Sequence, residues 1–210
     1  MQNLENAFFN VTLKNKPLII QFFVCLNFTL VLITAFGAFA IATSQSYFPF
    51  FYELGTISGQ IAVVFFILTL LPGMMRRFGV TSKIFAILMM FRRYLGILVY
   101  LFALMHAVLI KIVFNIMQYA STFPPVAVFE IFGIISLELL LVLVLTSNNF
   151  SVAKLGKWWK RIHSLVYIIV WLIFLHIALL QFNIWAVLIG ITACLEVFSF
   201  VVRFQKNKLK

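Results

Sequence analysis

Residues 157–180 read KWWKRIHSLVYIIVWLIFLHIALL, an apolar run with a basic start. The run exceeds the roughly 20 residues that a helix needs to cross the hydrocarbon core of a bilayer. His163 follows the basic and tryptophan residues, and His176 lies deep among leucine, isoleucine and phenylalanine. Ionisable side chains inside membrane helices are costly, and those that persist usually face the bundle interior and bind something. The stretch therefore predicts a membrane-spanning helix with ligand-binding imidazoles.

The composition is typical of an integral membrane protein. Of the 210 residues, 64% are hydrophobic and 10% are charged, and a soluble domain with several such runs would lack the polar surface that keeps it in water. The net charge of +11 does not indicate nucleic-acid binding, because the Lys and Arg residues form short clusters between apolar runs, where the positive-inside rule places them. Cys25 and Cys194 both lie in apolar runs, so we expect them to pack as small hydrophobic residues.

The apolar runs predict an all-α bundle of six transmembrane helices. They form a single domain, residues 17–203, between a short N-terminal tail and a basic C-terminal tail, residues 204–210. Pro72 and Gly73 favour an end of the second helix. The segment VTSKIFAILMM, residues 80–90, is too short to span, and we expect it to lie in the membrane interface as an amphipathic segment. The six expected spans are 17–42, 54–71, 94–116, 126–145, 162–180 and 184–202.

The basic residues alternate along the chain in a way that predicts topology. The two tails and the connections after the second and fourth helices carry Lys and Arg, whereas loop 43–53, loop 118–125 and loop 181–183 carry none. Cytoplasmic loops are the basic ones. We therefore expect both termini in the cytoplasm, and the third and fifth helices to run in the same direction, from the cytoplasm outward.

Two histidines are expected at the same depth. His106 lies thirteen residues after Arg93, and His176 lies fifteen after Arg161. At about 1.5 Å per residue, both rings should sit roughly 20 Å from the basic starts of their helices. Two neutral imidazoles at one level, on parallel helices with apolar walls, are what a b-type heme needs as axial ligands.

His163 differs from the other two, because it lies near the predicted cytoplasmic surface. Thirteen residues at about 100° each place His163 and His176 about 140° apart around a regular helix. Both face the third helix only if the fifth helix is bent. A histidine buried in the membrane can also hydrogen-bond a carbonyl of a neighbouring helix, and His163 can serve as an interfacial anchor. For all three histidines these alternatives stay open.

Other charged residues in the spans have functional and ordinary interpretations. Glu138 and Glu196 are intramembrane carboxylates suited to proton relay or substrate contact, but each can equally be protonated or paired. Lys111 can extend to the outer interface or contact a heme propionate. Arg92 and Arg93 are topology signals that can also bind the anionic groups of a heme or a flavin. The chain has no GxGxxG, P-loop, CxxCH or HExxH motif, so a Rossmann site and covalent heme attachment are unsupported.

Two stretches carry a resemblance to a known family. RRYLGILVYLFALMH, residues 92–106, and TSNNFSVAKLGKWWKRIHSLVYIIVWLIFLH, residues 146–176, resemble the ferric-reductase-like transmembrane domain family, and within it the heme-binding membrane subunits of bacterial systems that reduce protein methionine sulfoxide. The resemblance implies that His106 and His176 ligate heme b and that His163 matches a third family histidine, an alternative ligand. One heme is expected and a second is possible, although Arg93 stands where a further ligand on the third helix would lie.

The resemblance also implies a function. We expect a multi-pass protein of the bacterial inner membrane that transfers electrons from a cytoplasmic or membrane donor to an acceptor outside, as a subunit with no catalytic residue of its own. The implied partners are a cytoplasmic flavin reductase or quinol and a periplasmic molybdoenzyme-type reductase, with FMN as a possible second cofactor. The alternatives are a ferric or cupric metalloreductase component, a proton or metal transporter, and a non-catalytic assembly subunit.

Overall fold

The computed structural model describes residues 2–113, 115 and 126–208, and within these residues it is helical with no β-strand. Six segments are long and apolar enough to cross a membrane, which confirms the predicted six-span, all-α fold. The expected loop 118–125 and the expected end of the third span at residue 116 lie outside the described residues. The elements are α1 (Gln2–Lys14), α2 (Lys16–Thr43), η1 (Gln45–Tyr47), α3 (Phe48–Phe78), α4 (Lys83–Ala107), η2 (Val108–Ile112), α6 (Val128–Leu145), α7 (Asn149–Leu155), α8 (Lys157–His163), α9 (Val166–Leu180) and α10 (Ile184–Lys208).

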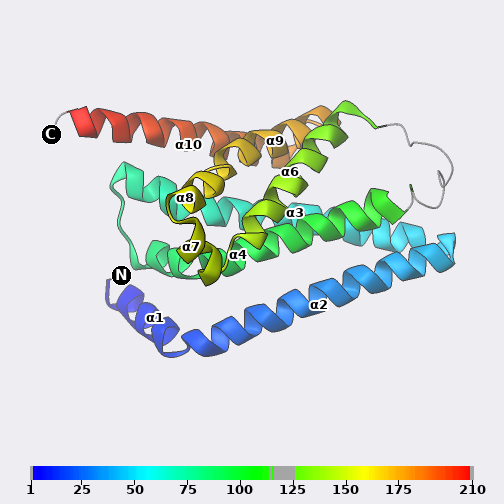
Figure 1. Cartoon of the computed structure of the whole chain (residues 1–210), viewed down its shortest axis with the longest axis horizontal. Helices are drawn as coiled ribbons and strands as arrows, with labels where there is room; N and C mark the ends of the chain where they lie inside the picture. Colours follow the sequence, from blue (N-terminus) through cyan, green and yellow to red (C-terminus); the bar gives the residue numbers. More distant parts are fainter. Residues whose placement is uncertain (1, 114, 116–125, 209–210) are drawn as a thin grey trace.

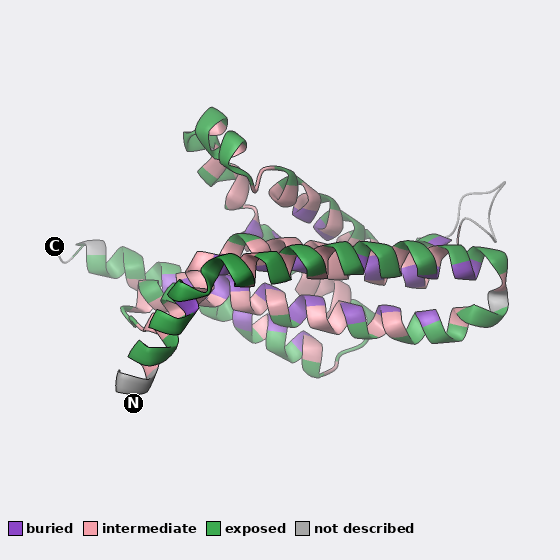
Figure 2. Ribbon diagram, turned by 90° about the horizontal axis from the view of Figure 1, so that it is seen from below, coloured by how far each residue is buried: buried purple, intermediate pink, exposed green. Residues whose placement is uncertain are grey.

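Two helix pairs form the bundle. α3 packs along α4, α6 packs along α9, and α10 contacts both α3 and α9 (Figure 1). α2 lies at the edge against α4, and its outer side is exposed along its length (Figure 2). Both ends of the described chain lie at the same end of the bundle in both views. This arrangement agrees with an even number of spans, while the side of the membrane stays a prediction.

Two apolar clusters hold these contacts together. One joins α3, α4, α6, α9 and α10 around fully buried residues such as Phe66, Ile169 and Ile189. The other joins α2, α3, α4 and η2 around Leu98 and Leu109. α3 and α4 belong to both clusters, so this helix pair lies where the two clusters meet.

α3 is longer than expected at both ends. It begins at Phe48, inside the expected loop 43–53, and it continues through Pro72, so the predicted end near Pro72 and Gly73 was wrong. Proline removes one backbone donor, which membrane helices tolerate when neighbouring groups compensate, and Pro72 is buried against the rest of the bundle. α3 ends instead at Gly79, whose φ of 91° is left-handed. The Val80 N–H then donates to the Met75 carbonyl at 2.9 Å, as in a Schellman motif.

α4 absorbs the segment that was expected to lie in the interface. Ser82 caps the helix by accepting a hydrogen bond from the Ile84 N–H at 3.1 Å, and the helix then runs unbroken to Ala107. The prediction of a separate interfacial segment was therefore wrong. The sequence pattern places Arg92 and Arg93 just before the third span, whereas they lie within the continuous helix α4, where long side chains can extend toward water.

The fifth span is broken, and the connection that precedes it is helical. Asn148 caps α7 by accepting from the Ser151 N–H at 2.8 Å. α8 ends at His163 and α9 begins at Val166. A turn at Ser164 and Leu165 therefore separates the segment that carries His163 from the segment that carries His176.

The N-terminal segment, expected from the sequence to be a short tail, forms α1 against the start of α4. The Glu5 carboxylate accepts hydrogen bonds from the Ser82 hydroxyl and the Lys83 N–H, both at 2.6 Å, so it caps α4 from another helix. These bonds stabilise the charged form, and the side-chain bond from Ser82 is the main cause that lowers the pKa of Glu5.

This cap predicts a pH dependence in α1. Because the folded pKa of Glu5 lies below its ordinary value of about 4.3, its stabilising effect is complete above that value and is lost as the pH falls through the folded pKa. The hydrogen-exchange protection factors of residues 5–14 should therefore fall on acidification between about pH 5 and pH 3. Glu5→Gln should exchange faster already at pH 7 and lose this acid transition. Glu53→Gln, which neutralises an exposed carboxylate elsewhere, should behave as wild type; identical profiles for both variants would contradict the cap.

Candidate functional site

His106 on α4 and His176 on α9 lie together although 70 positions separate them in the sequence. Their ring centroids are 6.2 Å apart, and the rings are nearly perpendicular, at 86°. α4 and α9 belong to different helix pairs, so the two rings meet where the α3–α4 pair faces the α6–α9 pair.

Each ring is held by a backbone carbonyl of its paired helix. His106 Nδ1 lies 3.0 Å from the Gly55 carbonyl oxygen on α3, and His176 Nδ1 lies 2.8 Å from the Phe129 carbonyl oxygen on α6. A carbonyl only accepts, so each Nδ1 carries the proton and each Nε2 carries the lone pair. This tautomer is the one that metal-ligating histidines adopt, with the second nitrogen fixing the orientation of the ring.

Two glycines give the rings their positions. A Cβ atom on Gly59 would lie 2.7 Å from His106 Nδ1, and a Cβ atom on Gly133 would lie 2.7 Å from His176 Nδ1. Any larger residue at either position would displace the imidazole. Sequence reasoning missed both glycines. The available signal was the spacing of Gly55 and Gly59, a GxxxG motif of the kind that marks close approach between membrane helices.

The spacing of the rings fits one metal ion between them. A metal ion bound axially by two imidazoles at about 2 Å places the ring centres about 6 Å apart. Among the described residues there is no group of three or more His, Cys, Asp and Glu side chains that could hold a metal ion. A metal at this position would therefore need further ligands that are not side chains of the described chain, such as the four nitrogens of a porphyrin.

An ion pair lies beside the histidines. Lys111 Nζ on η2 is 2.8 Å from Glu130 Oε1 on α6. Lys111 follows His106 by five residues, and Glu130 directly follows Phe129, whose carbonyl holds His176. The pair therefore joins the two halves of the bundle next to the two imidazoles.

His163 lies apart from this pair. Its Nε2 is 3.1 Å from the Thr146 hydroxyl at the end of α6, and its ring stacks on Trp159 with centroids 4.2 Å apart. Trp159 in turn donates to the Thr146 carbonyl at 2.9 Å. His163 is thus turned toward α6, and its contacts connect α8 to Thr146 at the end of α6.

The two arginines of the RRYLG stretch have different surroundings. Arg93 is exposed and donates to the Asn149 side chain at 3.0 Å. Arg92 is half-buried, and its charge lies within range of both His163 and Glu196. Together with Lys160 and Arg161 near His163, these two arginines form what we call the basic cluster.

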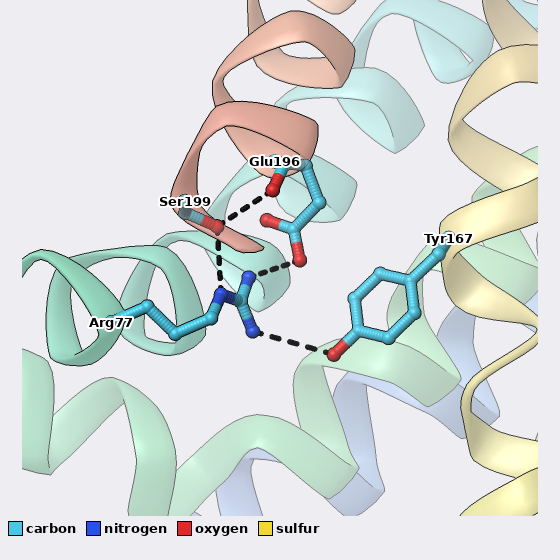
Figure 3. Close-up of polar contacts among 4 residues, drawn as sticks. All are labelled: Arg77, Tyr167, Glu196 and Ser199. Atoms are coloured by element: carbon cyan, nitrogen blue, oxygen red, sulfur yellow. Dashed lines mark hydrogen bonds and ion pairs between the residues drawn. The ribbon is translucent and has the colours of Figure 1, made fainter. Parts of the chain in front are cut away.

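A second polar site links α3, α9 and α10 (Figure 3). The Arg77 guanidinium pairs with the Glu196 carboxylate, donates to the Ser199 hydroxyl at 2.7 Å and lies 3.5 Å from the Tyr167 hydroxyl. Glu196 is 3% exposed, and its Oε2 has no hydrogen-bond partner within the described part of the chain. The two intramembrane carboxylates noted in the sequence therefore differ, since Glu196 is buried and paired whereas Glu138 is exposed.

Known proteins resemble this chain. Residues 58–175 match the family described as ferric reductase like transmembrane component. Similar curated proteins include the protein-methionine-sulfoxide reductase heme-binding subunits MsrQ of Brucella melitensis biotype 2, 40% identical over 113 residues, and of Brucella ovis, 39% identical over 113 residues. The alignments cover 52% of this chain and 49% of each relative, so the chain spans about half the length of the curated relatives it matches. No solved structure gives a significant match.

The family match covers more than half of the chain. It extends from within α3 to within α9, contains His106 and His163, and ends one residue before His176. It therefore includes both helix pairs that hold the facing imidazoles. This multi-pass membrane protein belongs to the ferric reductase like transmembrane component family.

Proposed function

We propose that the protein carries electrons across its membrane through one b-type heme with His106 and His176 as axial ligands. The observation that carries the proposal is the facing pair of imidazoles, 6.2 Å apart at their centroids, each with its Nδ1 bonded to a carbonyl. We assign the axial positions to these two residues because His163 is committed to Thr146 and Trp159. The match to heme-binding subunits supports the choice of cofactor.

The residues of the chain would perform two tasks for such a group. His106 and His176 each present Nε2 in a fixed orientation, because the carbonyls of Gly55 and Phe129 hold the opposite nitrogen. The apolar helices around them exclude water, which favours electron transfer over side reactions. When bound, the heme supplies a one-electron couple that ligand type and burial tune. With both axial positions filled, the protein is a conduit, and substrate chemistry belongs to its partners.

The partners and direction follow from the predicted topology and the relatives. We propose that the chain lies in the inner membrane, receives electrons from a cytoplasmic flavin reductase, reduced FMN or a membrane quinol, and delivers them outside. The name of the relatives supports a protein-methionine-sulfoxide reductase as the acceptor, and we propose that it is of the molybdoenzyme type that the family resemblance implies. Residues 17–203 would form the whole heme domain between two cytoplasmic tails.

An absorption spectrum tests the proposal. The protein, purified with added hemin, should show the split visible bands of a low-spin bis-imidazole heme after dithionite reduction, at one heme per chain. A transporter or an assembly subunit would show no such bands. A high-spin spectrum, or no heme at all, would contradict the assignment of both ligands.

The predicted topology, which determines the direction of electron flow, can be tested with fusion proteins. Because every second connection lacks Lys and Arg, alkaline phosphatase fused to the C-terminus should be inactive, and phosphatase fused after Thr43 should be active. A green fluorescent protein fused to the C-terminus should fluoresce. Active phosphatase at the C-terminus would reverse the direction of electron flow proposed here.

The basic cluster gives a second prediction. An anionic donor such as reduced FMN should be attracted to it, and salt should weaken that attraction. We expect heme reduction by reduced FMN to slow by about tenfold between low and high ionic strength. The double variant Arg92→Gln, Arg93→Gln should be slow at low salt and nearly insensitive to salt. The matched control, Arg203→Gln, Lys208→Gln, removes two exposed charges from α10 and should keep the salt dependence. A rate indifferent to salt in wild type would favour a quinol that enters from the bilayer.

A further inference from the structure

Lys111 is a cation in a region that has no other basic residue. It is the only Lys or Arg between Arg93 and Lys154, and all other basic residues of the chain lie in the clusters that mark the predicted cytoplasmic side. The positive-inside rule therefore does not account for it. A lone cation near the end of a membrane helix needs an anionic partner or water.

Its position is tied to His106 by a π-turn. The Val113 N–H donates to the Val108 carbonyl, an i→i+5 bond. In a regular α-helix, side chains five residues apart point about 140° away from each other, and the wider π-turn reduces this angle. Gly55 keeps the turn in place, since a Cβ atom there would lie 2.9 Å from Ile110 Cγ1. The same residue accepts the hydrogen bond from His106, so one contact with α3 orients both the imidazole and the turn that carries Lys111.

Glu130, the present partner of Lys111, is stabilised without it. Glu130 Oε2 accepts a hydrogen bond from the Ala127 N–H at 3.1 Å, and the carboxylate lies in the first turn of α6, where the helix dipole favours negative charge. The Lys111 side chain is 42% exposed and that of Glu130 is 17% exposed. Lys111 is therefore the more exposed member of the pair, and Glu130 keeps the Ala127 N–H and the dipole of α6 when Lys111 leaves it.

We propose that Lys111 is the counter-ion of a heme propionate, and that on heme binding its ammonium exchanges Glu130 for a propionate carboxylate. The inference rests on the proposed function, because it requires a heme between His106 and His176. A heme carries two propionates, and among the residues that the structure describes Lys111 is the one Lys or Arg that lies outside the basic segments of the predicted cytoplasmic side. Lys111 is thus a positioning residue for the cofactor, and Glu130 holds it beside the site beforehand.

The test compares three variants loaded with hemin. Lys111→Met should release heme to apomyoglobin about tenfold faster than wild type, the loss expected for one charge-assisted hydrogen bond, and its midpoint potential should fall because an uncompensated negative charge disfavours reduction. Lys111→Arg should behave nearly as wild type. Glu130→Gln keeps an oxygen for the Ala127 N–H and frees Lys111, so its heme should leave no faster than from wild type.

Heme dimethyl ester provides a second measurement that does not depend on a variant folding well. Loaded into wild type, the ester lacks the propionate charges and should reproduce the fast release seen in Lys111→Met; loaded into Lys111→Met, it should add no further acceleration. Equal acceleration by Lys111→Met and Glu130→Gln would show that the ion pair only ties two helices, and would overturn the inference. So would wild-type release from Lys111→Met. Failure of wild type to bind any heme would instead overturn the proposed function, and this inference with it.

Discussion

Replacing His106 with alanine should abolish the low-spin heme spectrum of the purified protein, and replacing His176 should do the same. Either change leaves one imidazole opposite an empty axial position, and no third His, Cys, Asp or Glu in the described chain stands with the pair to take its place. We expect a five-coordinate, high-spin heme or complete loss of heme. Optical spectra and the heme-to-protein ratio measure the outcome.

His163→Ala is the matched control for both variants. It removes an imidazole from the same span, but one that contacts Thr146 and Trp159, so the heme ratio and the low-spin bands should be retained. Equal loss of heme from all three variants would require a second heme or a shared ligand. Unchanged spectra in His106→Ala and His176→Ala would refute the assignment of these two residues.

Glycine variants test the same site with both imidazoles in place. Gly59→Ala and Gly133→Ala each put a Cβ atom 2.7 Å from a ligand Nδ1, so the ring must move away from the carbonyl that orients it. Loss of such an orienting contact typically weakens metal binding 10–100-fold. Gly73→Ala is the control, because its Cβ atom would make only ordinary contacts, the nearest at 3.7 Å to Arg77. If heme affinity is unchanged in all three variants, Gly59 and Gly133 are not required for heme binding.

Replacing Arg77 with methionine should destabilise the protein more than any other charge removal in the described chain. The change leaves the buried Glu196 carboxylate without its direct ion-pair partner, and breaking a buried pair in this way costs about 3–5 kcal/mol. For a chain of this size, such a loss lowers the melting temperature by about 10 °C. Thermal unfolding in detergent, followed by circular dichroism, measures the shift.

Lys206→Met is the control for Arg77. Lys206 also connects α10 to α3, through a bond of 3.0 Å from Nζ to the Phe78 carbonyl, but it is exposed, so its loss should cost no more than about 1 kcal/mol. The double variant Arg77→Met, Glu196→Leu should recover much of the stability, because no buried charge remains. A shift in Arg77→Met no larger than that in Lys206→Met would show that the pair does not hold these helices together.

The spans and the facing histidines could be predicted from the sequence because each depends on one-dimensional information. The runs of apolar residues determine which segments enter the bilayer, and counting residues from Arg93 and Arg161 places His106 and His176 at one depth. The ends of the helices were harder to predict from the sequence. Pro72 and Gly73 end helices in water, but in a membrane the apolar surroundings enforce backbone pairing, and α3 continues through both.

The details of the site depend on contacts between helices, which a single sequence does not record. Nothing near His106 indicates that the Gly55 carbonyl is its partner, and nothing near Glu196 indicates Arg77, which lies 119 residues away. Because Arg77 also fits the alternation of basic loops, the sequence gives no reason to look for an ion-pair partner of Arg77. The cap provided by Glu5 was missed for the same reason, since its partners Ser82 and Lys83 belong to another helix.

The carbonyls that hold the two imidazoles have a consequence for biogenesis. His106 is oriented by α3, the span synthesised just before its own, and His176 is oriented by α6, which likewise precedes it. Each hairpin therefore leaves the translocon with its ligand already set, without help from the other hairpin. Cofactor loading then becomes the last event of maturation, after both hairpins have met. When heme supply is short, cells should accumulate an inserted, folded precursor that can be filled later, with no new protein synthesis.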